Sequence, residues 1–289
     1  YYLVVGDDCA VAFTLSDDGY VGLQSVSLLD FSEEPWEHTE TILDAFPMGK
    51  LTMPENSSEG NIVYEKKNLR LSYVLENSMS GLSDTEGQGS DEKITKQNIT
   101  KQSITKQSIR IRHITCQFDN FYQGKSFSCD IRLHQPDMDT MVIATPWEKK
   151  GRFYYNQKIN CMRAEGYAEY DGKRYEFQPD RHFGTLDWGR GVWTYDNTWY
   201  WGSGNCDVNG HAFGFNIGYG FGNTKAASEN VVFYDGIAHK IDDVEFVISE
   251  GDYCKPWKFT IMTKMVINKN ALAVNTSKLQ QNMQKVIVS

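Results

Sequence analysis

The stretch that decides the fold, Arg181–Gly204, reads RHFGTLDWGRGVWTYDNTWYWGSG. It holds four of the seven tryptophans of the chain, with glycines between them. Large rigid rings beside residues without a side chain indicate an aromatic wall where the backbone bends or approaches another group closely. Charged residues lie inside this apolar setting, where each charge needs a partner or a chemical role. The stretch therefore predicts the place of a site more sharply than its chemistry.

Outward from this stretch, period-two alternation of apolar residues dominates and indicates strands. Asp171-Gly172, Asn209-Gly210 and Asp235-Gly236 are dipeptides that close two-residue hairpins, and each has strand-like flanks. Many short strands joined by tight turns, with glycines inside the strands, favour a barrel or a sandwich. We predict a mainly β fold in which these pairings occur: 166–170 with 174–177, 199–203 with 212–218, 231–234 with 238–241, and 9–15 with 20–29.

Two β-units packed together are expected, residues 1–150 and 151–289. The boundary is placed near residue 150 because Pro146 removes a ladder donor and Lys149-Lys150-Gly151 is turn chemistry. A low-complexity insert, residues 78–108, interrupts the first unit, and in it ITKQ recurs every five residues. That period matches neither a strand nor a helix, so we interpret the insert as a mobile loop. A strand hairpin that extends beyond the barrel is the alternative.

Composition excludes several classes of function. The net charge of −9 argues against a nucleic-acid partner, and there is no apolar run long enough to span a membrane. The six cysteines are scattered, which favours free thiols in the cytoplasm over disulfides. The sequence has no dinucleotide fingerprint, phosphate loop or metal-ligand spacing, so no cofactor and no metal are expected.

Asp187 is the leading candidate for chemistry because it lies between Leu186 and Trp188. An apolar surround favours the protonated form of a carboxylic acid, which can then act as a general acid. Arg190, three residues on, or His182 would set the protonation of Asp187. The competing interpretation is a buried Asp187–Arg190 pair that only fixes the glycine-rich turns.

The aromatic residues could shield a hydrocarbon or stabilise a cationic intermediate. Alternatively they form core, since three of the tryptophans lie at even spacings from one another and could face one side of strands. The aromatic candidates are Trp188, Trp193, Tyr195, Trp199 and Trp201.

Glu229 and Asn230 open a predicted strand after a loop rich in glycine and asparagine. An acid at the start of a strand can point into a barrel mouth, where Glu229 could position water. More often, such residues cap the loop.

These motifs resemble a bacterial family known only as domain of unknown function 2804. The resemblance rests on LDWGRGVW at 186–193 with Tyr195 and on later matches that include Asn216-Ile217-Gly218, Glu229-Asn230, Asp235-Gly236 and Pro256-Trp257. Upstream it includes Pro146-Trp147 and Lys158. Members carry a further segment ahead of the position of Tyr1. The resemblance implies two lipocalin-like barrels of the calycin type, distantly related to carotenoid hydratases and tocopherol cyclases, and it adds Asn216 to the ligand-binding candidates.

The leading hypothesis is an enzyme that hydrates or cyclises an alkene in an apolar or amphipathic small molecule, with Asp187 as the proton donor. A non-catalytic carrier of a lipid, isoprenoid or tetrapyrrole is the alternative. A carbohydrate-active or carbohydrate-binding protein is a third, because tryptophan platforms beside carboxylates also suit sugars. The sequence leaves the ligand and the oligomeric state open.

Overall fold

The computed structural model describes residues 1–79, 108–248, 251 and 255–262, and within them the chain forms strands and no helix. The predicted mainly β fold is confirmed. The insert predicted at 78–108 lies outside the described residues except for its ends, which finish one strand and begin the next. Every strand pair in the three sheets is antiparallel.

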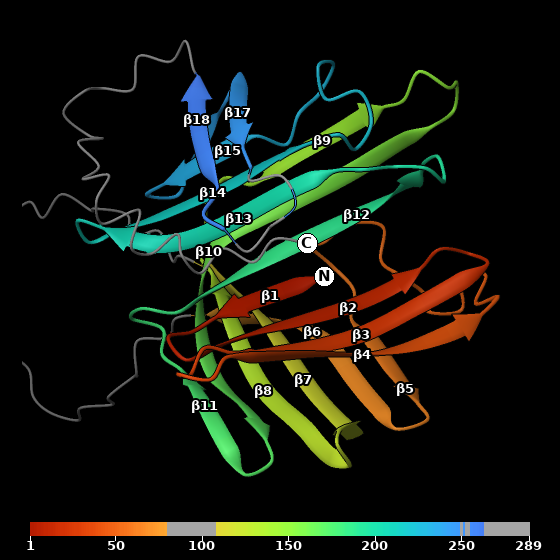
Figure 1. Cartoon of the computed structure of the whole chain (residues 1–289), viewed down its shortest axis with the longest axis vertical. Helices are drawn as coiled ribbons and strands as arrows, with labels where there is room; N and C mark the ends of the chain where they lie inside the picture. Colours follow the sequence, from red (N-terminus) through yellow and green to blue (C-terminus); the bar gives the residue numbers. More distant parts are fainter. Residues whose placement is uncertain (80–107, 249–250, 252–254, 263–289) are drawn as a thin grey trace, which may run out of the picture.

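The largest sheet has twelve strands (Figure 1). Ten of them follow one another across it in the order β4 (Trp36–Ala45), β3 (Val21–Asp30), β2 (Cys9–Asp17), β1 (Tyr2–Val5), β12 (Phe183–Val192), β10 (Phe153–Tyr170), β8 (Lys125–Gln135), β7 (Ser108–Tyr122), β6 (Leu69–Met79) and β5 (Ile62–Lys66). The other two, β9 (Met141–Pro146) and β11 (Lys173–Phe177), pair with opposite ends of β10.

Two smaller sheets complete the fold. One has the order β13 (Tyr200–Val208), β14 (His211–Tyr219), β15 (Val231–Tyr234) and β16 (Ile237–Lys240). The other is a hairpin of β17 (Asp243–Val247) and β18 (Lys258–Met262). The described chain forms no helix long and apolar enough to cross a membrane.

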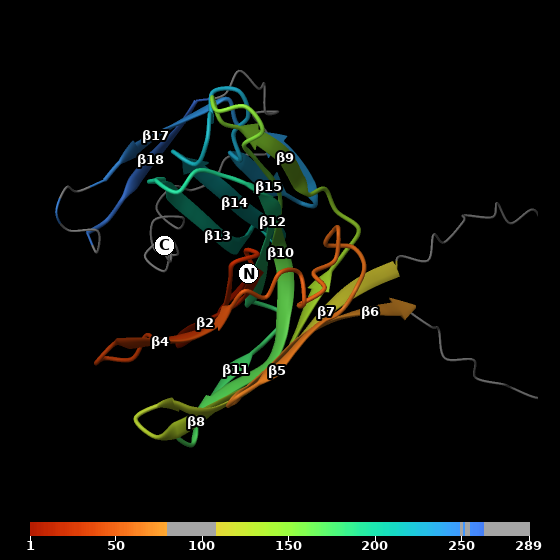
Figure 2. The same cartoon turned by 90° about the vertical axis from the view of Figure 1, so that its right-hand side faces the viewer.

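The large sheet curls so that its two limbs face each other across an apolar core (Figure 2). The rings of Phe13 on β2 and Phe127 on β8 approach to 6.3 Å between centroids, although the two strands lie far apart in the strand order. Both rings are completely buried, as are Phe118, Ile131 and others of the same cluster. Burial of this apolar surface is the main term that holds the curled sheet closed.

Buried Asp30 ties one limb to the other. Its carboxylate accepts hydrogen bonds of 2.6 Å from both the Tyr175 hydroxyl and the Lys173 ammonium on β11, and one of 2.8 Å from the Ser32 backbone. Burial by itself raises the pKa of Asp30, but these donors stabilise the ionised form and hold the pKa well below its ordinary value. The ionised carboxylate therefore fastens the end of β3 to β11.

The predicted hairpins are confirmed at Asp171-Gly172, Asn209-Gly210 and Asp235-Gly236. They join β10 to β11, β13 to β14 and β15 to β16. Both residues of each dipeptide have positive φ, which Asn, Asp and Gly tolerate better than other residues. The hairpin of β2 and β3 is confirmed as well, across residues 17–21.

Strands from both sides of residue 150 share the large sheet. β10 is hydrogen-bonded to β8 along Arg163–Tyr170, and β1 pairs with β12. Hydrogen bonding in the large sheet is thus continuous across residue 150. The division into two lipocalin-like units, 1–150 and 151–289, stays a prediction.

A bulge divides β10 into two halves. The register with β12 shifts between Ile159 and Met162, and Cys161 has a φ of 60°. The half before the bulge pairs with β9 and β12, and the half after it pairs with the end of β12 and then with β8 and β11. A bulge twists and bends a strand, so β10 runs from the curled sheet to a position beside β13 and β14 (Figure 2).

Candidate functional site

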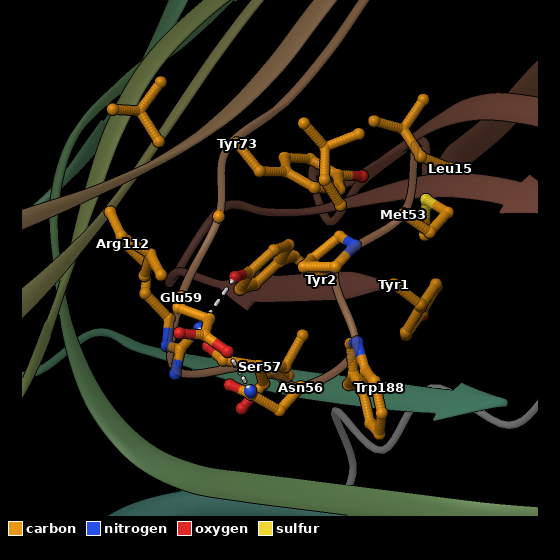
Figure 3. Close-up of a pocket in the computed structure, with 16 residues that line it drawn as sticks. Tyr1, Tyr2, Leu15, Met53, Asn56, Ser57, Glu59, Tyr73, Arg112 and Trp188 are labelled. Carbon is orange, nitrogen blue, oxygen red and sulfur yellow. Dashed lines mark hydrogen bonds between the residues drawn. The ribbon is translucent and has the colours of Figure 1, made fainter. Parts of the chain in front are cut away.

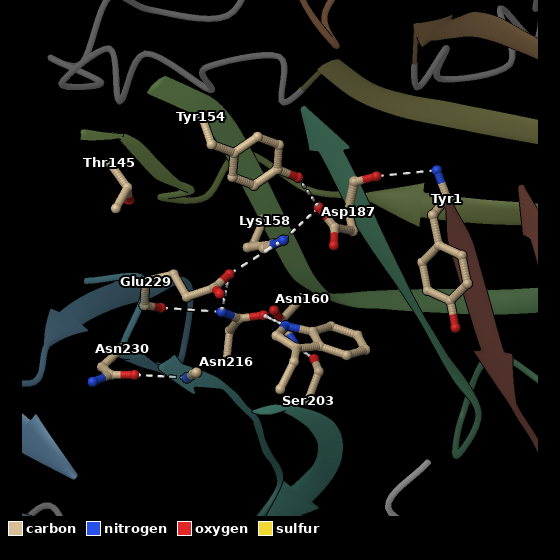
Figure 4. A network of polar contacts seen from close by, with 12 residues as sticks. Tyr1, Thr145, Tyr154, Lys158, Asn160, Asp187, Ser203, Asn216, Glu229 and Asn230 are labelled. Carbon is tan, nitrogen blue, oxygen red and sulfur yellow. Dashed lines mark hydrogen bonds and ion pairs between the residues drawn. The ribbon is translucent and has the colours of Figure 1, made fainter. Parts of the chain in front are cut away.

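Lys158 lies at the centre of the candidate site (Figure 4). It stands opposite Asp187 in the register of β10 and β12, so the two side chains share a face of the sheet. The Lys158 ammonium contacts the Asp187 carboxylate and lies 3.2 Å from Glu229 Oε2, just before β15. Only 3% of the Lys158 side chain is exposed, against 23% for Asp187 and 14% for Glu229. Two strands and the loop before β15 thus bring one ammonium and two carboxylates together.

The two carboxylates keep Lys158 charged. Burial by itself lowers the pKa of a lysine, but the charges of Asp187 and then Glu229 outweigh it and raise the pKa of Lys158 above its ordinary value. The ammonium also lies over the rings of Tyr154 and Trp201, 5.8 and 5.7 Å from their centroids. The cluster therefore sets two carboxylates against one ammonium.

Tyr154 adds a hydroxyl to the cluster. It lies four residues before Lys158 on β10, hence on the same face, and its hydroxyl donates to Asp187 Oδ1 at 3.4 Å. Burial, with the charge of Asp187 next, raises the pKa of Tyr154 above its ordinary value. The phenol consequently stays protonated, and Asp187 accepts from both Lys158 and Tyr154.

Asn216 holds Glu229 in place. Its side chain is completely buried on β14 and accepts a 2.8 Å hydrogen bond from the indole of Trp201. Its amide nitrogen donates to the backbone carbonyl of Glu229 at 3.0 Å and to Oε2 at 3.2 Å. A Cβ at Gly218 would lie 2.7 Å from Glu229 Oε1, so glycine is needed there for the carboxylate to fit. The next residue, Asn230, accepts from the Gly218 backbone at 2.8 Å and supports this loop rather than facing the cluster.

The β10 bulge is anchored directly beside the cluster. Asn160, fully buried, donates to Ser203 Oγ at 2.9 Å and to Asn205 Oδ1 at 3.1 Å. Asn205 Oδ1 also accepts from the Cys161 backbone at 2.8 Å, and its amide donates to Thr185 on β12 at 2.9 Å. These bonds fasten β10 and β12 to β13, and so fix the position of Lys158 relative to the smaller sheet.

An aromatic layer lies beside Tyr154. The rings of Phe221 and Tyr154 pack in a T-shaped arrangement at 5.1 Å, and Phe221 contacts Trp193 and Trp199 at 5.7 and 5.0 Å between centroids. Trp193 also packs on Tyr154 at 5.7 Å. Trp193 and Trp199 keep 36% and 47% of their surface exposed, so this layer is partly open to solvent.

The other two aromatic candidates lie elsewhere. Trp188 faces the opposite side of β12 from Asp187, where it packs on Tyr155 at 5.7 Å. Tyr195 is 88% exposed and contacts the ring of Tyr20. The three tryptophans at even spacing do not share a strand face, because Trp193 and Trp199 lie outside β12 and β13 and only Trp201 is in a strand.

Two expected partners of Asp187 are corrected by the structure. Arg190 is exposed, three positions on along β12 and hence on the other face, and within the described residues no ion pair joins it to Asp187. His182 is buried five positions before Asp187, where it accepts from the Gln178 backbone at 2.9 Å and lies 3.2 Å from Asp7. Lys158 and Tyr154 occupy the place next to Asp187 that was expected for Arg190 or His182.

Lys158, Tyr154 and Asn160 are the residues that sequence reasoning left without a role. The signal that could have found Lys158 is a lone lysine in the first half of a long strand, residues 153–162, which contains no other charged residue. Lysine is almost never fully buried without a partner. Within the described residues, no group of three or more His, Cys, Asp or Glu side chains could hold a metal ion.

Comparison with known proteins gives one solved structure and one family. The crystal structure of kievitone hydratase from Nectria haematococca matches with a TM-score of 0.47 and 10% identity, covering 90% of this chain and 71% of that one. The activity named there is that of the other protein. No curated protein sequence matches. The family model described as Domain of unknown function (DUF2804) matches residues 1–271, which contain every strand that the structure describes and the whole cluster, and the chain therefore belongs to this family.

Proposed function

We propose that the cluster of Lys158, Asp187, Glu229 and Tyr154 is a proton-transfer site. In this proposal, the protein catalyses cofactor-free hydration or cyclisation of an alkene in an apolar or amphipathic small molecule. The observation that carries the proposal is the buried Lys158 ammonium shared by two carboxylates, one of which also accepts the Tyr154 hydroxyl. Perturbed titratable groups that gather in one place are typical of functional sites.

The charges in the cluster leave room for one more proton. With both carboxylates ionised, the cluster carries one net negative charge. Asp187 can take up a proton without leaving the buried ammonium unpaired, because Glu229 still balances Lys158. Asp187 is also the most exposed of the three, which makes it the member that a ligand can reach.

The reaction balances as a single addition. Protonated Asp187 transfers its proton to one carbon of the alkene, and the neighbouring carbon becomes cationic. The restored negative charge of the cluster and the faces of Trp193 and Trp199 stabilise this cation. Water then adds to the cationic carbon and returns a proton to Asp187. In a cyclisation, a second π bond attacks in place of water, and a proton leaves a neighbouring carbon for Asp187.

The two alternative functions, a carrier and a glycosidase, assign different roles to the same residues. A carrier would use the aromatic layer of Trp193, Trp199 and Phe221 and leave the ion pairs structural. A glycosidase needs two carboxylates that face a gap filled by sugar and water. Here the Lys158 ammonium lies between Asp187 and Glu229, an arrangement that favours proton transfer to an apolar ligand over cleavage of a sugar.

Asp187→Asn tests the proposal because it keeps the size of the side chain and its hydrogen bonds while removing the acid. Small molecules that co-purify with the wild-type protein are identified by native mass spectrometry and offered back to both proteins, together with a panel of isoprenoid alkenes. We expect turnover by the wild type and at least a hundredfold less by Asp187→Asn, at similar ligand binding. Equal turnover by the variant, or binding without turnover by both proteins, would overturn the proposal.

A further inference from the structure

A small pocket lies on the other face of β12 from the cluster (Figure 3). Leu186 and Trp188 line it, and these alternate along the strand with Asp187. Its remaining walls come from β1, β2, β5, β6, β7 and the segment 53–60. The pocket measures about 40 Å³, which is room for about three groups the size of a water molecule. It therefore fits the head of a ligand and not a whole lipid.

Arg112 is the charged group in this pocket. It is 2% exposed, and its Nε donates to Gln135 at 3.0 Å. Its Nη1 donates to the Ser57 carbonyl at 2.8 Å and to the Tyr2 hydroxyl at 3.3 Å. Its Nη2 has no hydrogen-bond partner among the described residues, and no carboxylate there forms an ion pair with it. A buried guanidinium cannot release its proton, so its charge is left without a counter-ion.

The neighbouring groups add donors rather than a second cation. The Tyr2 hydroxyl accepts from Arg112, which leaves its own O–H free to donate into the pocket. Glu59 lines the outer part, is exposed, and is held by Asn56 at 2.6 Å. The rest of the lining is largely apolar and aromatic, with Leu15, Met53, Ile62, Tyr73 and Trp188.

We propose that this pocket binds the carboxylate of a small organic acid whose apolar or aromatic tail lies along Leu15, Met53 and Trp188. A carboxylate has three heavy atoms, which matches the volume, and it would accept from Arg112 Nη2 and from Tyr2. Glu59 and the net charge of −9 disfavour a dianion such as phosphate. The site goes beyond the proposed function, because it uses none of the residues of the Lys158 cluster.

Benzoate is the probe, with benzamide as its neutral control of the same shape and inorganic phosphate as the dianion. Binding is measured by ligand-observed NMR titration of the folded wild-type protein. We expect saturable binding of benzoate and at least tenfold weaker binding of benzamide and phosphate, since a hydrogen bond to a charged group is worth about a tenfold change in affinity or more. Equal binding of benzamide, or no saturable binding of benzoate, would overturn the proposal.

Variants then assign the contact. Arg112→Met should abolish benzoate binding. If that variant does not fold, Arg112→Lys and Tyr2→Phe test the same contact, because each should weaken benzoate binding at least about threefold. Glu59→Gln removes a like charge and should tighten binding. Asp187→Asn should leave benzoate binding unchanged. The proposal of a carboxylate site can therefore fail independently of the proposed proton-transfer site. Benzoate affinity unchanged in a folded Arg112 variant would contradict the assignment.

Discussion

Replacing Lys158 by methionine tests the electrostatic account of the cluster. Methionine keeps an unbranched side chain of similar length, so the change chiefly removes the ammonium. Asp187 and Glu229 are then left facing each other without a shared cation. Breaking a buried ion pair from one side costs about 3–5 kcal/mol. Because both carboxylates keep some exposure, we expect a loss near the lower end, about 3 kcal/mol of unfolding free energy at pH 7.

Urea unfolding followed by tryptophan fluorescence measures this loss, at pH 7 and at pH 5. The pKa of Lys158 is raised above its unfolded value of 10.5, so its contribution is present throughout this range and is lost only as the pH rises through the folded value. Lys158→Met should therefore be less stable than the wild type at both pH values.

The matched control is the same substitution in an Asp187→Asn/Glu229→Gln background. There the lysine has no carboxylate partner to lose, so Lys158→Met should cost less than about 1 kcal/mol or even stabilise the protein. Equal losses in the two backgrounds at pH 7 would refute the reasoning, since they would show that Lys158 stabilises the fold through packing alone.

Three further predictions concern the supports of the sheet and the site. Because the pKa of Asp30 is lowered in the folded state, its contribution to stability is present above the unfolded value of 3.8 and is lost as the pH falls. Asp30→Asn should therefore lower the free energy of unfolding at pH 7 by about 2 kcal/mol and make stability fall less steeply at acid pH. An unchanged dependence on acid pH would contradict this. Gly218→Ala should displace the Glu229 carboxylate and reduce turnover more than stability. Gly210→Ala is the control, because a Cβ at that turn position meets no atom within 4 Å, and it should leave turnover intact. Asn205→Ala frees buried donors at the β10 bulge and should cost about 1–3 kcal/mol in urea unfolding, and a loss below 0.5 kcal/mol would show that the bulge needs no anchor.

Much of the fold could be predicted from local patterns. The Asx-Gly hairpins follow from residues that tolerate positive φ, and alternation gave the strands around them. The bulge at Cys161 could not be predicted, because Cys161 is neither glycine nor asparagine and its conformation is fixed by Asn205, 44 positions on. The strand β10 is therefore one long element, Phe153–Tyr170, whereas the pairing predicted from the sequence covered only residues 166–170 of it.

The sequence points to Asp187 through its apolar neighbours but does not predict its contacts. In the structure, Asp187 pairs with Lys158 in the cluster. Proximity in the sequence suggests Arg190 as its partner, but a residue three positions on in a strand lies on the other face of the sheet. Lys158 is 29 positions earlier in the chain, and only the register of β10 with β12 brings it opposite Asp187. Register depends on long-range packing, which a single sequence does not display.

The central claim is that Asp187 moves a proton onto an alkene. The most direct measurement is incubation of wild-type and Asp187→Asn protein with the co-purified ligand and the alkene panel in ¹⁸O-labelled heavy water, followed by mass spectrometry of the products. The account predicts that the wild type adds one deuterium to carbon and, in a hydration, one labelled oxygen, and that the variant binds the same alkene without incorporating either label. Label incorporated equally by both proteins, or by neither when both bind the alkene, would contradict it.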